Sequence, residues 1–335
     1  MNGSNSTVLR NPSVGLLWCS AFSFQAIGIL VSNCMTIVTF GLNKHLRKRS
    51  VYLLINLSIA DFLVGILPLP LYIYIVGLHY STWSKPSPRV HVIIYHGYHY
   101  LDIFTGLTSI MNLALISLER MLATVWPLRH RVTTSRAYVS IIISTWIFAA
   151  MVAAVTTYIN GFFEDHAVYA AWVPFSFLLS SLFLIIISYS VVFANFKLCS
   201  QRMAGKNRVR QNHYQNKKLA KTLLIVSAAS ILAWFPFAII NGIHYYTYLH
   251  INETALNVIK LLHYMNSLIN TFIYASRMPE FRAALFRLTC KCCRLGQNSM
   301  TKPPSIHMID TRNNIVYGRV QDSTVKNLSN TPTST

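Results

Sequence analysis

Charged side chains are scarce in this sequence, and acidic ones are the scarcest. Only 11% of the 335 residues are charged, against about 25% in soluble globular proteins, and nine acids stand against 29 lysines and arginines. Because 53% of the residues are hydrophobic, the chain is not a disordered protein. The net charge of +20 would suit nucleic-acid binding, but such proteins are rarely so poor in total charge. The composition therefore favours a polytopic membrane protein with unevenly placed cations and no nucleic-acid partner.

Motifs of the common enzyme classes are missing as well. The sequence has no HExxH motif and no glycine-rich phosphate loop, and no set of His, Asp and Ser has the spacing of a catalytic family. We therefore expect no enzymatic activity and no required cofactor. A membrane transporter is the alternative from a different class. It would need inverted repeats or a continuous path of ionisable residues, and neither is apparent.

Seven stretches are long and apolar enough to cross a bilayer as helices, which takes about 20 residues each. They cover residues 16–41, 51–78, 92–123, 138–158, 170–196, 222–246 and 256–276. This pattern predicts an all-α membrane protein with a seven-transmembrane helix bundle over residues 16–276. An outer tail of residues 1–15 precedes the bundle. A short amphipathic helix over 277–288 follows it, and residues 289–335 form a Ser/Thr-rich tail that we expect to be disordered.

The cations lie where a membrane protein faces the cytoplasm. With the N-terminus outside, the three inner loops contain fifteen lysines and arginines, and the outer segments contain three. Cationic loops stay cytoplasmic, so we predict an N-out/C-in, multi-pass protein of the plasma membrane, with its inner cations facing anionic lipids. Glycosylation sequons then begin on the outer side at Asn2, Asn5 and Asn252.

A group of cysteines follows the amphipathic helix at the inner leaflet, where S-palmitoylation is expected: Cys290, Cys292 and Cys293. The alternative for these cysteines is free cytosolic thiols.

Motifs in all seven spans resemble those of the rhodopsin-like (class A) G-protein-coupled receptors. In chain order they are Asn33, the run NLSIAD at 56–61, SLERM at 117–121, Trp126-Pro127, Trp146, Tyr189, Trp234-Phe235-Pro236 and NTFIY at 270–274. The resemblance covers about three quarters of the chain. It implies a receptor that converts binding of an extracellular ligand into activation of a heterotrimeric G protein. Arrestin and receptor kinases are further partners that it implies.

The resemblance also implies a sodium ion as an allosteric modulator, bound beside Asp61 in the middle of the membrane. The other expected ligands bear hydroxyl or amide oxygens, which suit a small hard cation; they are Ser109, Asn266, Ser267 and Asn270. The alternative is a neutral Asp61 in a static polar network.

Glu119 and Arg120 lie at the inner end of span three, where the acid can hold the guanidinium by a charge-assisted hydrogen bond. In the family, release of this arginine opens the inner face to the G protein, and Tyr189 and Tyr274 support the open arrangement. The alternative is an ion pair of the membrane interface without a switching role. Asn216 stands where the family has an acid at the foot of span six, so we expect a weak resting tie and raised basal activity.

Span six contains the expected hinge of the switch. Pro236 removes a backbone hydrogen bond and kinks the helix, and Trp234 lies within the same turn. This arrangement would let the indole respond to the ligand and to the sodium site together.

Asp102 marks the expected ligand site, because it lies about five helical turns outward of the switch arginine. In bioamine receptors this position and that of Tyr264 hold the ammonium of the ligand, and Phe237 would add a cation–π attraction. The remaining expected members of the site are Trp234, His99 and Asn241. We therefore expect a cationic ligand, either an amine or a basic peptide. The alternative is an internal partner for Asp102, drawn from Tyr264, His99, His263 and Lys260.

Several departures from the family pattern keep other ligands open. No cysteine lies in an outer loop, and the second outer loop is short, as in melanocortin receptors and some of their lipid-binding relatives. A lipid ligand is thus an alternative within the same fold. The retinal-binding lysine position holds Tyr264, which argues against light sensing. Eight histidines lie in or near the outer half, so modulation by protons or zinc is a further alternative.

Overall fold

A computed structural model describes residues 11–43, 46, 51–163, 167–202, 220–237, 239–240 and 252–289 of the chain. Within these ranges the protein is built from helices and contains no strand, as the apolar runs predicted. The helices are α1 Pro12–Leu42, α2 Val51–Ile66, α3 Pro68–His79, α4 Pro88–Val125, α5 Pro127–Val132, α6 Ser135–Phe162, α7 Ala167–Arg202, α9 Glu253–Arg277 and α10 Pro279–Thr289. A further helical segment, Ala220–Phe237, belongs to the sixth predicted span.

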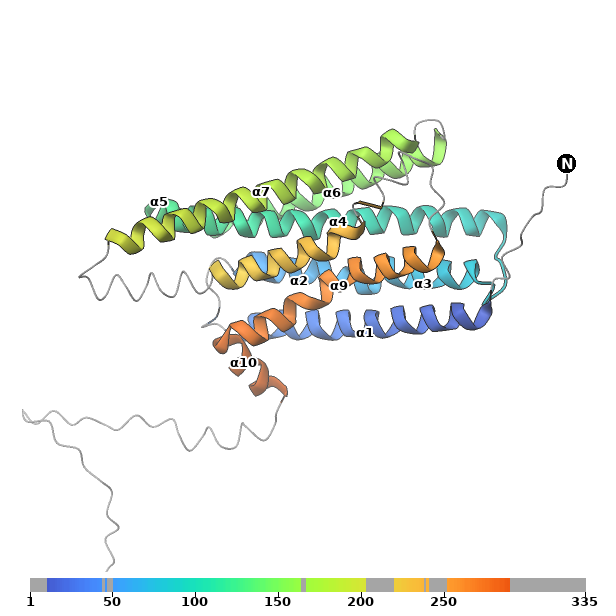
Figure 1. Cartoon of the computed structure of the whole chain (residues 1–335), viewed down its shortest axis with the longest axis horizontal. Coiled ribbons are helices and arrows are strands. Elements are labelled where there is room, and N and C mark those ends of the chain that lie inside the picture. Colours follow the sequence, from blue (N-terminus) through green and yellow to red (C-terminus); the bar gives the residue numbers. More distant parts are fainter. Residues whose placement is uncertain are drawn as a thin grey trace, which may run out of the picture. The chain divides into compact units, whose positions relative to one another are not determined.

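The long helices lie side by side, with α4 between α2 and α3 on one side and α6 and α7 on the other (Figure 1). α1 packs against α2, α3 and α9, so the first and last spans close the bundle. Among the described residues, six helical segments are apolar and long enough to cross a membrane. α9 is not among them, because its inward face is rich in polar residues that the bundle buries; they include His263, Asn266, Ser267 and Asn270.

Capping residues, rather than apolarity, set the outer ends of the helices. α1 begins at Pro12, four residues before the predicted span, because Asn11 caps it: its side chain accepts a hydrogen bond from the Ser13 N–H at 3.0 Å. Proline at a first helical turn sacrifices no hydrogen bond, and α4 begins in the same way at Pro88. Asn252 caps α9 through the Thr254 N–H at 2.9 Å.

The second span is interrupted, which the hydropathy pattern alone did not predict. Instead of one helix over 51–78, α2 ends at Ile66 and α3 begins at Pro68. Proline lacks the N–H that a continuous helix would use, and Leu67 before it has a non-helical backbone, with φ of −111° and ψ of −80°. The two helices together still form one span, Val51–His79.

Polar side chains join the helices inside the bundle, whereas apolar ones cover its outside. Asn56 of α2 donates to the Asn112 side chain of α4 at 2.5 Å and accepts from the Trp146 indole of α6 at 2.9 Å. In a bilayer the hydrophobic effect does not drive helices together, so packing and such hydrogen bonds must do so. Phe24 and Leu232 are 81% and 72% exposed, as expected of side chains that face lipid.

Candidate ligand, ion and switch sites

An ion pair joins α4 to α9 at the expected ligand site. Lys260 Nζ donates to Asp102 Oδ2 at 2.6 Å, and the Tyr264 hydroxyl donates to Asp102 Oδ1 at 2.8 Å. Lys260 and Tyr264 are four residues apart on α9, so both reach the same carboxylate. The side chains of Asp102 and Lys260 are only 11% and 14% exposed. Asp102 therefore has internal partners on both oxygens in this state.

The Lys260 ammonium also lies over the faces of aromatic rings from four helical segments. Its nitrogen is 4.5 Å from the ring centre of Phe237, 5.5 Å from those of Tyr98 and Tyr264, and 5.7 Å from that of Tyr72. Aromatic faces attract cations, and more strongly where water is excluded. We call these four rings, Asp102 and Lys260 together the cation box.

His263 connects the cation box to the hinge of span six. Its ring is 4.1 Å from Trp234, 4.5 Å from Phe237 and 5.0 Å from Tyr264, measured between ring centres. Trp234 in turn lies over Gly106 of α4, where a Cβ atom would be only 2.8 Å from the indole. Glycine is therefore required for this approach, and a displacement of α9 at Lys260 would reach Trp234 directly through packed rings.

The five residues of the expected sodium site come together around Asp61. Ser109 and Ser267 donate hydroxyl hydrogen bonds to Asp61 Oδ1 at 3.0 and 2.9 Å, and Asn270 donates to Oδ2 at 2.7 Å. Asn266 donates to Ser109 at 3.5 Å. Asp61 is fully buried and joins α2 to α4 and α9.

Two side-chain carbonyl oxygens in this cluster indicate whether a cation could bind there. The Oδ1 atoms of Asn266 and Asn270 are buried and have no hydrogen-bond partner among the described residues. Together with the carboxylate and hydroxyl oxygens they form a set of hard ligands within one buried cluster. The residues present therefore fit a sodium ion.

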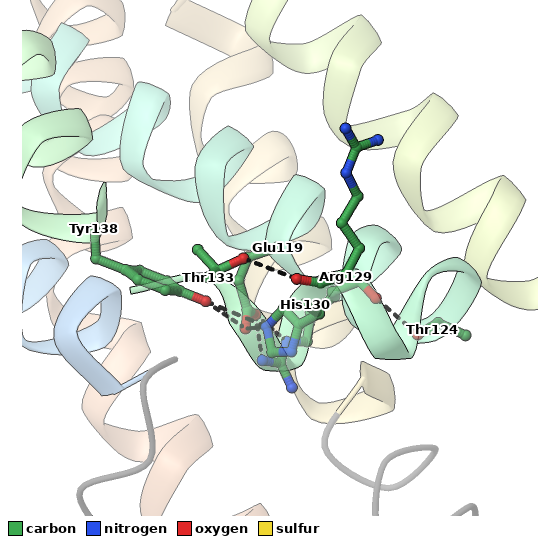
Figure 2. A network of polar contacts seen from close by, with 7 residues as sticks. Glu119, Thr124, Arg129, His130, Thr133 and Tyr138 are labelled. Atoms are coloured by element: carbon green, nitrogen blue, oxygen red, sulfur yellow. Dashed lines mark hydrogen bonds and ion pairs between the residues drawn. The ribbon is translucent and has the colours of Figure 1, made fainter. Parts of the chain in front are cut away.

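At the inner end of α4, Glu119 binds more than its neighbour in sequence. Arg120 donates to Oε2 of Glu119 through its Nε and Nη2 atoms. The other oxygen, Oε1, lies 2.8 Å from His130 Nε2 of α5 and accepts from the Tyr138 hydroxyl of α6 at 3.4 Å. Figure 2 shows His130 and Tyr138 pointing toward Glu119, whereas the side chain of Arg129 points away. Tyr138 and His130 also contact each other at 3.2 Å.

The two tyrosines expected to support the open arrangement have other partners here. The Tyr189 hydroxyl accepts from Ser227 at 3.5 Å. Tyr274 is fully buried and packs edge-on against Phe40 and Phe281, with ring centres 6.3 and 6.1 Å apart. The ring contacts of Tyr274 tie α9 to α1 and α10 at the inner end.

His130 and Tyr138 were not predicted as members of any site, and His263 was named only as an alternative internal partner of Asp102. His130 was taken as part of a cationic loop, and Tyr138 as the first residue of an apolar span. A local signal for His130 exists: Pro127 begins a short helix, and its first turns carry His130 back toward the end of α4. His99, which was expected at the ligand, lies 2.8 Å from the Asn160 side chain instead.

Several predicted residues lie outside the part of the chain that the structure describes: Asn2, Asn5, Asn216, Asn241, Cys290, Cys292 and Cys293. Within that part, no group of three or more His, Cys, Asp or Glu residues could hold a metal ion, so the outer histidines form no such zinc site there. Pro236 lies in the helical segment Ala220–Phe237, as the hinge requires.

The geometry agrees with a comparison against known families. Residues 32–274 match the family model described as seven-transmembrane receptor (rhodopsin family). The chain belongs to this family. It is thus a G-protein-coupled receptor of the plasma membrane and not an enzyme, and α9 serves as its seventh span.

Individual relatives are similar along most of the receptor. The sheep (Ovis aries) adenosine receptor A3 is 27% identical over 82% of this chain and 90% of its own length. The guinea-pig (Cavia porcellus) histamine H2 receptor is 26% identical over 81% of this chain and 78% of its own. A rhodopsin of the ant Cataglyphis bombycina is 26% identical over 88% of this chain and 85% of its own.

The ion pair between Asp102 and Lys260 predicts a characteristic pattern of stability. Lys260→Met or Asp102→Asn alone should lower the stability of the receptor by roughly 3 kcal/mol, because each leaves a buried charge without its partner. The double variant should be much closer to the wild type. Thermal unfolding of the purified receptor in detergent measures this, with Leu262→Ala on the exposed side of α9 as control. Simple addition of the two single effects would contradict a direct charge pair.

Proposed function

We propose that this receptor converts the binding of a small extracellular ligand at the cation box into activation of a heterotrimeric G protein. The observation that carries the proposal is the ion pair between Lys260 and Asp102, which joins α4 to α9 in the outer half of the bundle. A ligand that brings an ammonium group to Asp102 competes with Lys260 for the same carboxylate. The histamine H2 relative is named for an amine, which supports a ligand of this kind.

The packed rings below the ion pair suggest how the signal leaves the outer site. When Lys260 is displaced, the outer end of α9 loses its ion pair with α4 and keeps only the hydrogen bond from Tyr264 to Asp102 at this carboxylate. His263 on the same helix moves with Lys260. The ring of His263 packs edge-on against Trp234, so the shift reaches the sixth span beside Pro236. A tightly packed contact of this kind passes on small displacements because it cannot absorb them as free volume.

The Asp61 cluster supports the role of sodium as a negative modulator. The residues that would hold the ion are Asp61, Ser109, Asn266, Ser267 and Asn270, which come from α2, α4 and α9. When bound, the ion supplies a positive charge that neutralises Asp61 and draws the three helices together. An ion that binds one arrangement more tightly shifts the population toward it. Here the favoured arrangement is the one in which α2, α4 and α9 meet around Asp61.

The inner cluster supports Glu119 as the residue that restrains Arg120. His130 and Tyr138 engage Oε1 of Glu119, which leaves Oε2 directed at the guanidinium. The second inner loop, through α5, is therefore attached to the switch. In this proposal a G protein that moves α5 also loosens the hold on Arg120.

Nucleotide exchange tests the function. The receptor, purified and reconstituted in lipid nanodiscs, should accelerate GTP binding to at least one class of purified heterotrimer without added ligand. Arg120→Ala should remove that acceleration while the protein remains folded by circular dichroism. The proposal fails if no heterotrimer responds to the wild-type receptor.

His130 is expected to restrain basal activity. His130→Phe should raise basal exchange several-fold, because Glu119 loses a hydrogen-bond partner and holds Arg120 in a less fixed geometry. His130→Gln retains an N–H donor and should stay near the wild-type rate. Equal rates for both variants would show that the contact with Glu119 does not matter.

Sodium is expected to lower basal exchange through Asp61. At constant ionic strength, replacing potassium chloride by sodium chloride should slow exchange by the wild-type receptor. Asp61→Asn should abolish the difference, because the amide cannot neutralise a cation. A sodium effect of equal size in the variant would exclude the Asp61 cluster as its origin.

A further inference from the structure

The cation box contains both a carboxylate and an ammonium of the chain itself, and this limits which ligands it accepts. Asp102 and Lys260 are 2.6 Å apart and mostly buried, so each depends on the other for charge compensation. A ligand with a single charge pairs with one of them and deprives the other. Separating one partner from a buried pair is costly, because it leaves an uncompensated charge in a medium of low dielectric constant.

A ligand that carries only an ammonium, or only an acidic group, leaves one residue of the Asp102–Lys260 pair without charge compensation. An amine that takes Asp102 leaves the Lys260 ammonium with only aromatic faces, which attract a cation more weakly than a carboxylate does. An acid that takes Lys260 leaves Asp102 with the hydroxyl of Tyr264 as a neutral partner. The two nearest histidines among the described residues do not replace the lost charge, because His99 is bound to Asn160 and His263 is packed among the rings of Trp234, Phe237 and Tyr264.

We propose that the ligand carries an ammonium group and an acidic group together, as an amino acid does. Its ammonium would bind Asp102 and its acidic group would bind Lys260, so the charges alternate and none is left unpaired. Each new contact is a charge-assisted hydrogen bond. The ion pair opens without the cost of an isolated charge, and the ionic tie between α4 and α9 is removed. This inference deepens the proposed function and rests on the cation box being the ligand site.

The surroundings of the ion pair indicate the rest of the ligand. Tyr72, Tyr98 and Phe237 lie within 6 Å of the ammonium nitrogen, at 5.7, 5.5 and 4.5 Å. Aromatic and apolar groups pack well against such rings. The site therefore favours a compact ampholyte with an aromatic or apolar body over a strongly polar one.

Three matched compounds test the inference: phenylalanine, phenethylamine, which lacks only the carboxylate, and 3-phenylpropanoate, which lacks only the ammonium. Their binding to the purified receptor in nanodiscs is measured by ligand-observed NMR and by thermal shift. For the wild type, phenylalanine should bind about tenfold more tightly than either of the others, since only it leaves no charge unpaired.

Two variants should change which of the three compounds binds most tightly, each in the opposite direction. Lys260→Met leaves Asp102 alone, so phenethylamine should become the best of the three. Asp102→Asn leaves Lys260 alone, so 3-phenylpropanoate should become the best. The same order of the three compounds in the wild type and both variants would overturn the inference, and so would the absence of binding by any of them.

Basal nucleotide exchange by the same wild-type preparation distinguishes a failure of the ampholyte inference from a failure of the proposed function. If exchange is accelerated but the compounds show no reciprocal preference, the ampholyte inference fails and the proposed function stands. If no heterotrimer responds at all, the proposed function fails, whatever the compounds bind.

Discussion

A charge buried in the apolar interior of a membrane must be neutralised by a partner, and this requirement organises the bundle. Three acids lie within the spans, and each is engaged by groups from at least one other helix. Asp102 on α4 is paired with α9, Asp61 on α2 with α4 and α9, and Glu119 on α4 with α5 and α6. Because α4 takes part in all three, it is the common element through which the outer, middle and inner levels are connected.

These three levels differ in how tightly their acids are held. Asp61 is fully buried and accepts three hydrogen bonds from neutral groups, which leaves it with an uncompensated charge that a cation can satisfy. Asp102 and Glu119 each have a cationic side chain of the same chain as a partner. Under the proposed function, the middle level responds to an ion from solution, whereas the other two respond to competitors for an internal pair.

Much of the fold could be predicted from the sequence, because a transmembrane helix has a strong local signature. Six spans show it plainly, and the residues around Asp61 meet as the family motifs implied. The break at Pro68 shows the limit of hydropathy, which averages over a window and does not register one missing N–H.

Contacts between distant segments were harder to predict. Lys260 is four residues from Tyr264, and this spacing fits both an internal partner of Asp102 and a residue that faces a ligand. Only the packing of α9 against the rest of the bundle distinguishes the two. His130 required knowledge of how α5 turns back beneath α4, since its own neighbours in sequence suggest nothing more than a cationic loop.

The polarity of α9 has a consequence for how the receptor enters the membrane during synthesis. A lysine at the centre of a lone helix would oppose insertion by about 2.5–3.5 kcal/mol. α9 carries Lys260 in its first third, together with a histidine and several amides. The translocon would therefore release this helix poorly into lipid by itself. The earlier spans, already inserted and presenting Asp102 and Asp61, offer the counter-charge and hydrogen-bond partners that make its insertion favourable. Insertion of the last span would thus depend on the acids that pair with it in the folded receptor.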